Sequence, residues 1–138
     1  MSAPKEPVIV RDSKEQKPFK FKGPTRVAGL KTCDYTIAGC EDMIGIERKS
    51  MGDLIACLGS QRARFERELL RAKEFEYAAV VVEGSYADLA SGNYRSRFHP
   101  KSAIESISTF EVRYKIPFLF CGDRELAGRK CESLLRKF

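Results

Sequence analysis

The stretch Ile46-Glu47-Arg48-Lys49-Ser50-Met51-Gly52-Asp53 decides the fold, because a strand pattern changes there into a helix pattern. Side chains alternate across a strand, so Glu47 and Lys49 point to the same face. Ser50 suits a helix N-cap, and Asp53 three residues later forms a near capping box with it. A carboxylate that can hold a divalent cation thus stands beside an ammonium group that can orient or deprotonate a water. A carboxylate and an ammonium group are the smallest set of side chains with which metal-dependent cleavage of a phosphodiester can proceed.

The residues on either side of this stretch predict alternating strands and helices. β-Branched or apolar runs predict strands at 8–11, 25–30, 35–38, 43–48, 77–82 and 117–121. Helices are expected from Ser50 to about Phe75, with Gly59-Ser60 as a point of interruption, and over 101–114 and 124–135. Residues 86–99 are polar and predict a segment rich in loops. The predicted fold class is α/β, with a central mixed β-sheet flanked by helices.

Length and composition limit the class of protein. The 138 residues fit one domain, which we place at 7–138 after a flexible tail over 1–6. No apolar run is long enough to span a membrane, and the N-terminus lacks the apolar stretch of a signal peptide. Five cysteines without a CxxC pair favour free thiols. We therefore expect an intracellular protein without a membrane partner, cytoplasmic if bacterial or phage-encoded and nuclear if eukaryotic.

Positive charge predicts a polyanionic partner. The net charge is +6 and the isoelectric point is about 9.1. Basic side chains crowd the N-terminal third, and four arginines lie on one predicted helix. Candidate DNA-binding residues are Lys14, Arg62, Arg64 and Arg67. The alternative for the helix arginines is an ordinary solvated surface.

Four sequence blocks together resemble the nuclease domain of the XPF/Hef family of structure-specific DNA endonucleases. These blocks are Asp12-Ser13-Lys14-Glu15-Gln16, Cys33-Asp34-Tyr35, Ile46-Glu47-Arg48-Lys49 with Asp53-Leu54, and Val80-Val81-Val82-Glu83-Gly84. Their order and spacing agree with the family over about residues 8–122. The chain is similar above all to stand-alone bacterial or phage members without a helix-hairpin-helix module. The resemblance implies a restriction-endonuclease-like fold.

The resemblance also implies a role for each matching residue. Asp34 and Glu47 would hold Mg²⁺, for which Mn²⁺ can substitute, and Lys49 would position the attacking water. Arg48 would contact the substrate phosphate, although alternation sends it to the opposite strand face, where a salt bridge is the alternative. Supporting residues would be Asp12, Glu15, Asp53 and Glu83. Each of these has a structural alternative, as a turn, a strand end or a helix cap.

Two substitutions distinguish this chain from the family pattern. Cys33 stands where the family has glycine, and Lys14 stands where it has arginine, which forms bidentate phosphate contacts more readily than lysine does. The expected activity is hydrolysis of DNA phosphodiesters, at branched DNA or single/double-strand junctions, in repair or recombination. The alternatives are a catalytically inactive DNA-binding or partner subunit and a protein that acts on RNA.

The resemblance further implies a homodimer through the C-terminal half of the chain. Large apolar residues are numerous there, and some of them are expected on the monomer surface. They are Ile104, Ile107, Phe110, Phe118, Phe120, Leu134 and Leu135. The alternative is that all seven fill the core of a monomer.

Overall fold

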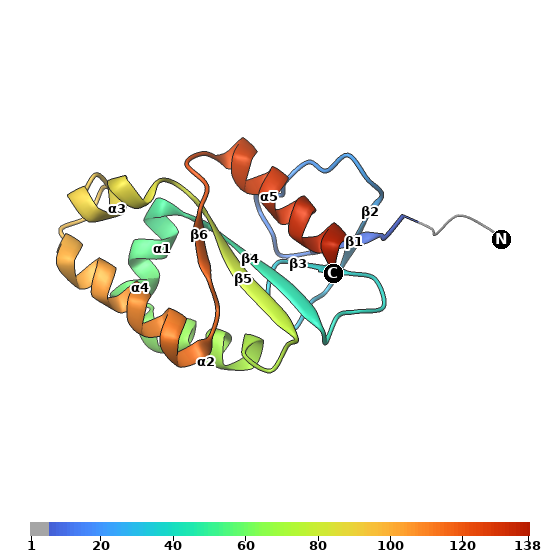
Figure 1. Ribbon diagram of the computed structural model, residues 1–138, viewed down its shortest axis with the longest axis horizontal. Helices are drawn as coiled ribbons and strands as arrows, with labels where there is room; N and C mark the ends of the chain where they lie inside the picture. The colour runs from blue at the N-terminus through green and yellow to red at the C-terminus, as the bar shows by residue number, and fades with distance from the viewer. Residues whose placement is uncertain (1–5) are drawn as a thin grey trace.

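A six-stranded mixed β-sheet organises the protein, as a computed structural model of the chain shows for residues 6–138 (Figure 1). The strands are β1 (Ile9–Asp12), β2 (Thr25–Ala28), β3 (Tyr35–Ile37), β4 (Ile44–Ser50), β5 (Tyr77–Glu83) and β6 (Phe118–Phe120). Their spatial order is β2-β1-β3-β4-β5-β6. β3 is antiparallel to both of its neighbours, whereas every other adjacent pair is parallel. All but Glu6 of the tail expected over 1–6 lies outside the described residues.

Helices cover both faces of this sheet (Figure 1). They are α1 (Met51–Leu58), α2 (Arg62–Ala72), α3 (Tyr86–Ser91), α4 (Pro100–Tyr114) and α5 (Arg124–Lys137). Buried residues of α1 to α4 share one apolar core, and those of α5 belong to a second core on the opposite face. The predicted α/β class with a helix-flanked mixed sheet is therefore confirmed. None of the helices in residues 6–138 is long and apolar enough to cross a membrane.

β5 explains why the sheet is covered on both faces. Its residues Ala78, Val80 and Val82 contribute to the core under α1, α2 and α4. The alternate residues Ala79 and Val81 contribute to the core under α5. A strand whose side chains are buried on both faces reads as a continuous apolar run. The prediction from this run, a strand covered on both sides, is confirmed.

One helical prediction is confirmed and another needed correction. The interruption expected at Gly59-Ser60 is present, because α1 ends at Leu58 and the Gly59 N–H donates to the carbonyls of Ile55 and Ala56. The segment expected to be loop over 86–99 contains α3. Ser85 caps this helix by accepting a hydrogen bond from the Asp88 N–H at 3.0 Å, and Leu89 anchors it in the core. The Ser-x-x-Asp pattern that begins α1 thus also begins α3.

The apolar residues near the C-terminus lie deeper than the dimer argument required. Ile107, Phe110, Phe118 and Leu135 are buried, and the other three of the expected set are partly buried. The exposed apolar side chains nearby are different ones, including Val112 on α4 at 79% and Tyr86 on α3 at 49%. The monomer core therefore takes up most of the seven residues.

Candidate active site

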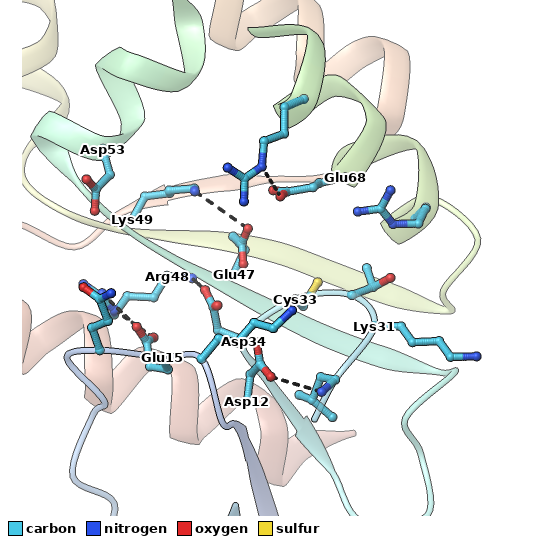
Figure 2. A pocket seen from close by; sticks show the side chains of 16 residues that line it. Asp12, Glu15, Lys31, Cys33, Asp34, Glu47, Arg48, Lys49, Asp53 and Glu68 are labelled. Carbon is cyan, nitrogen blue, oxygen red and sulfur yellow. Dashed lines mark hydrogen bonds and ion pairs between the residues drawn. The ribbon is translucent and has the colours of Figure 1, made fainter. Parts of the chain in front are cut away.

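A polar pocket of about 470 Å³ lies where the ends of β1 and β4 meet the start of β3 (Figure 2). Because β3 runs antiparallel to both neighbours, Asp34 at its start lies beside Asp12 at the end of β1. The N–H of Asp12 donates to the carbonyl of Asp34 at 2.8 Å. On the other side, the N–H of Asp34 donates to the carbonyl of Ile46 at 3.0 Å. The sheet register therefore fixes which acidic residues meet.

Asp34 and Glu47 form the acidic centre of the pocket (Figure 2). Asp34 Oδ2 accepts a hydrogen bond from the Arg48 N–H at 2.8 Å, which fixes the carboxylate against β4. Only 14% of the Glu47 side chain is exposed. Burial raises the pKa of Asp34, and burial together with the Asp34 charge raises the pKa of Glu47 well above its ordinary value. The two crowded carboxylates therefore disfavour carrying both negative charges at once, and a nearby cation or a shared proton would relieve this repulsion.

Lys49 lies on the same strand face as Glu47, as alternation predicts. Its Nζ is 3.8 Å from Glu47 Oε2 and 5.2 Å from the centroid of the Phe65 ring. Burial alone would lower the pKa of Lys49, but the neighbouring Glu47 carboxylate raises it above its ordinary value. The ammonium group is therefore charged at neutral pH. Its distance from Glu47 is long for a direct hydrogen bond, so it can still donate to a further group in the pocket.

Arg48 points away from Glu47 and Lys49, and its guanidinium group binds two carboxylates. Its Nε and Nη2 donate to the two oxygens of Glu15, both at 2.9 Å. Its Nη1 donates to Glu83 Oε1 at 3.3 Å. The other oxygen of Glu83 accepts from Arg124 at 3.0 Å. The salt bridge given as the alternative for Arg48 is therefore present, and its acidic partners are Glu15 and Glu83.

Asp12 and Asp53 both line the pocket with structural bonds of their own. Asp12 is buried, and its Oδ1 accepts from the Leu30 N–H at 3.1 Å, which holds the turn after β2. The Asp53 N–H donates to Ser50 Oγ at 3.1 Å, as the capping pattern predicts. Asp53 is exposed, and its side chain faces the pocket (Figure 2). Its carboxylate therefore remains available at the rim.

Cys33 occupies the turn that precedes Asp34 in a backbone conformation that favours glycine. Its φ is +66°, in the left-handed region, which explains the glycine of the family pattern. Its side chain fits because Gly45 on β4 has no Cβ. A Cβ at Gly45 would lie 2.7 Å from the Cys33 sulfur. Burial and the charges of Glu47 and Asp34 raise the pKa of the Cys33 thiol, so it stays protonated.

The structure separates the predicted DNA-binding residues into two groups. Lys14 and Arg64 line the pocket, whereas Arg62 and Arg67 do not. Arg62 is bound within the protein: it donates to Ser106 at 2.8 Å and lies over the Phe110 ring. Arg67 is exposed on α2 outside the pocket.

Two pocket residues, Lys31 and Glu68, were not proposed for the site from the sequence, and Arg71 was considered only as one of the four helix arginines. Glu68 pairs with Arg64 at 3.7 Å on the rim (Figure 2). The spacing of Arg64, Glu68 and Arg71 by four and three residues places all three on one helix face. This spacing was the signal that could have found them, since Arg64 was already a candidate.

The donor set suits a hard divalent cation that keeps part of its water shell. Within residues 6–138, no three His, Cys, Asp and Glu side chains are arranged as metal ligands. Asp34 and Glu47 supply carboxylate oxygens close together, with raised pKa values that a cation would relieve. Mg²⁺ is commonly bound through one or two carboxylates and several waters. The residues present therefore fit such an ion.

Known proteins share this fold and its sequence pattern. The ERCC4 domain family matches residues 7–133. The structure of XPF from Aeropyrum pernix is similar at a TM-score of 0.72 and 22% identity, and its complex with DNA at 0.75 and 23%. Each similarity covers 95% of this chain and 64% of the other, so this chain spans less than two thirds of that length. No curated protein matches the sequence. The matching blocks and the shared fold show that the chain belongs to the ERCC4 domain family and has the fold of the XPF nuclease domain.

Proposed function

We propose that this protein is a metal-dependent endonuclease that hydrolyses phosphodiester bonds in DNA. The observation that carries this proposal is the Asp34–Glu47 pair, half enclosed beside the charged Lys49. Membership in the ERCC4 domain family supports it. A purely structural pair of carboxylates would be matched by cations, as Glu15 and Glu83 are. At the centre of the pocket, Asp34 and Glu47 share a single neighbouring cation within residues 6–138, Lys49, whose Nζ stays 3.8 Å from Glu47 Oε2.

Asp34 and Glu47 would hold the metal ion, with Mg²⁺ as the expected ion and Mn²⁺ as a substitute. A bound divalent ion supplies charge stabilisation at the phosphate oxygens and lowers the pKa of a bound water. The Arg48 N–H holds Asp34 in place through a hydrogen bond at 2.8 Å. Lys49 Nζ lies within reach of a water beside Glu47 and would orient it for attack. Arg48 positions Asp34 through its backbone while its side chain ties β4 to Glu15.

Cations around the pocket would hold the substrate. Lys14, Lys31, Arg64 and Arg71 surround the acids and can neutralise the phosphates on either side of the scissile bond. The similar XPF structure from Aeropyrum pernix is a complex with DNA. We expect binding to weaken steeply with salt and to show little sequence preference. Branched DNA and single/double-strand junctions are the proposed substrates, in repair or recombination.

The decisive experiment is cleavage of labelled duplex, flap, fork and four-way DNA with Mg²⁺, Mn²⁺ or EDTA. Asp34→Asn and Glu47→Gln should abolish cutting while binding survives. Glu41→Gln is the matched control, because Glu41 is exposed on the turn before β4. Unchanged turnover in either pocket variant would remove that residue from the mechanism. RNA versions of the same substrates separate DNA from RNA specificity.

The alternative is a catalytically inactive subunit that binds DNA or a partner on the same fold. The presence of Asp34, Glu47 and Lys49 in one pocket favours the enzyme over this alternative. Tight binding to every DNA substrate with no cleavage under either metal would support the inactive subunit.

We propose further that two copies pair through the β6 edge of the sheet. Within residues 6–138, β6 pairs with a strand only on its β5 side. Tyr86 packs over the ring of Phe120 at 5.4 Å between centroids, and Val112 is exposed on the adjoining layer. A symmetric pair would cover this apolar surface. Light scattering at micromolar concentration tests the pairing, and a fully active monomer would overturn it.

A further inference from the structure

A second groove lies on the α5 face of the protein, away from the pocket. It measures about 700 Å³ and separates the loop between β1 and β2 from the first half of α5. Its basic lining comes from Lys20 and Lys22 on the loop and from Arg124 and Arg129 on the helix. The two walls approach closely at Gly128, where an added Cβ would lie 3.1 Å from the Phe19 ring.

The loop wall is anchored although its sequence predicts irregular structure. The Phe19 N–H donates to the Tyr35 hydroxyl at 2.8 Å, and the two rings stack at 5.3 Å. The carboxylate of Glu132 accepts from the N–H groups of Lys22 and Gly23 at 3.2 and 3.1 Å. Burial opposes the effect, but these two hydrogen bonds lower the pKa of Glu132. The groove therefore exists before any ligand arrives.

Three of the basic side chains are free to bind an anion. Lys20, Lys22 and Arg129 are exposed and form no ion pair within residues 6–138. The fourth, Arg124, is paired with Glu83. Of the two acids in the lining, Glu132 is already occupied by N–H groups and Arg136, which leaves Glu125 as the opposing charge. The available charge in the groove is therefore positive.

One segment of chain runs from the active-site pocket to the groove. Lys14 and Gln16 line the pocket, and Pro18, Phe19, Lys20 and Lys22 line the groove. Arg124 joins the two: its Nη2 donates to the carbonyls of Lys17 and Pro18, both at 2.7 Å. Its Nη1 donates to Glu83, which also binds Arg48 at 3.3 Å. A chain of lysines at 14, 17, 20 and 22 follows this path.

We propose that this groove binds a single strand of nucleic acid through its phosphates, as a second contact beside the pocket. The volume is in the range of small-ligand sites, which suits a few nucleotides of one strand and not a duplex. Branched DNA has such a strand next to the strand that is cut. The inference deepens the proposed function and rests on it for the identity of the substrate.

The test compares two triple variants in EDTA, which prevents metal-dependent cutting. Lys20→Gln, Lys22→Gln and Arg129→Gln remove the groove cations. Lys73→Gln, Arg97→Gln and Lys101→Gln remove the same charge from exposed residues outside the pocket and the groove. Anisotropy of a labelled single-stranded oligodeoxynucleotide is measured against salt. Loss of three phosphate contacts should reduce the slope of log affinity against log salt by about 2.

The groove variant should lose at least about tenfold in affinity at low salt, and clearly more than the control variant. Equal losses in the two variants would overturn the proposal. Labelled polyglutamate serves as a rival probe, and a groove-dependent loss for this peptide but not for the oligonucleotide would also overturn it. Circular dichroism of both variants checks that they are folded.

A second experiment uses the unaltered protein, so its result does not depend on whether the variants fold correctly. Acylation of lysines, followed by mass spectrometry, should show Lys20 and Lys22 protected by the oligonucleotide while Lys73 and Lys101 react as before. Unprotected groove lysines would overturn the proposal. Cleavage assays distinguish the groove proposal from the proposed function. If the groove binds DNA but the protein cuts no substrate, the groove proposal holds and the proposed nuclease function fails. A cutting enzyme whose groove variant matches the control rejects the groove alone.

Discussion

The two faces of β4 carry ionic clusters of opposite character. On one face, the Arg48 guanidinium binds both oxygens of Glu15 and one of Glu83, and Arg124 binds the other. On the other face, Glu47 meets a second carboxylate and a lysine that stays 3.8 Å away. We call the cluster around Arg48 closed and the cluster around Glu47 open, so neighbouring residues of one strand belong to different clusters.

The difference separates a structural from a functional use of buried charge. The closed cluster leaves its carboxylates bonded to guanidinium groups, so each of these buried charges has a partner of opposite sign. The open cluster keeps carboxylates close together with raised pKa values, which costs stability until a cation arrives. The carboxylates bonded to guanidinium groups and the carboxylates proposed to hold a metal ion therefore lie on opposite faces of one strand.

The largest expected effect comes from breaking the closed cluster. Arg48→Met leaves the Glu15 and Glu83 side chains, which are 5% and 10% exposed, without their shared partner. Removal of one partner from a buried ion pair costs about 3–5 kcal/mol. Urea denaturation should show this loss in the free energy of unfolding. Arg113→Met, which breaks an exposed pair with Glu66, is the control and should cost at most about 1 kcal/mol. A loss in Arg48→Met no greater than that of the control would contradict the distinction.

Addition of a divalent cation should stabilise the protein through the open cluster. At about 100 times its dissociation constant, Mg²⁺ or Mn²⁺ should contribute about 2.7 kcal/mol to the free energy of unfolding. Thermal unfolding with and without EDTA measures the effect. Glu47→Gln should lose most of it, whereas Glu41→Gln should keep it. Equal stabilisation of all three proteins would place the ion elsewhere.

Without metal, Glu47→Gln should make the protein more stable at neutral pH. The folded-state pKa of Glu47 is raised, so between the unfolded pKa of about 4.3 and that value the folded state binds more protons. Stability therefore falls as pH rises through this window, and the penalty is complete above it. The variant lacks the penalty and should therefore be more stable than the unaltered protein at pH 7. Urea denaturation in EDTA from pH 4 to 8 should show the gain vanish toward pH 4. A destabilised variant at pH 7 would mean that the attraction between Glu47 and Lys49 outweighs the repulsion between Glu47 and Asp34.

The smallest expected effect concerns Cys33 at the edge of the open cluster. Cys33→Ala keeps the left-handed backbone strain and removes the sulfur that fills the space beside Gly45. Cys33→Gly loses the same contact but relieves the strain. The glycine variant should therefore be more stable than the alanine variant by about 1 kcal/mol. Chemical denaturation of the pair measures this difference, and an alanine variant as stable as the glycine variant would show that the turn carries no strain.

Local patterns in the sequence predicted much of this arrangement. The period of a strand places Glu47 and Lys49 on one face and Arg48 on the other, and the structure has them so. The apolar run of β5 predicted coverage on both faces. α3 was missed although Ser85 and Asp88 repeat the capping pattern of α1.

Contacts between distant segments could not be predicted in the same way. No local pattern indicates that Gly45 makes room for Cys33, because the two residues meet only through the register of β3 and β4. The anchoring of Lys22 by Glu132, 110 residues later, depends on the packing of the whole sheet. Arg62 is another such case: its charge suggested a contact with DNA, and no local pattern indicated that it contacts the Phe110 ring and Ser106 within the protein.

The attachment of α5 to the N-terminal loop sets an order of events in synthesis. Arg124 and Glu132 hold residues that lie 106 to 110 positions earlier in the chain. Contacts of such long range form late, after the cost of closing a large loop has been met. A ribosome that has translated as far as β6 has already made every acidic residue of the pocket. The nascent chain still lacks the Arg124 guanidinium that completes the Glu83 pair, so the closed cluster behind the pocket is complete only when the last helix emerges.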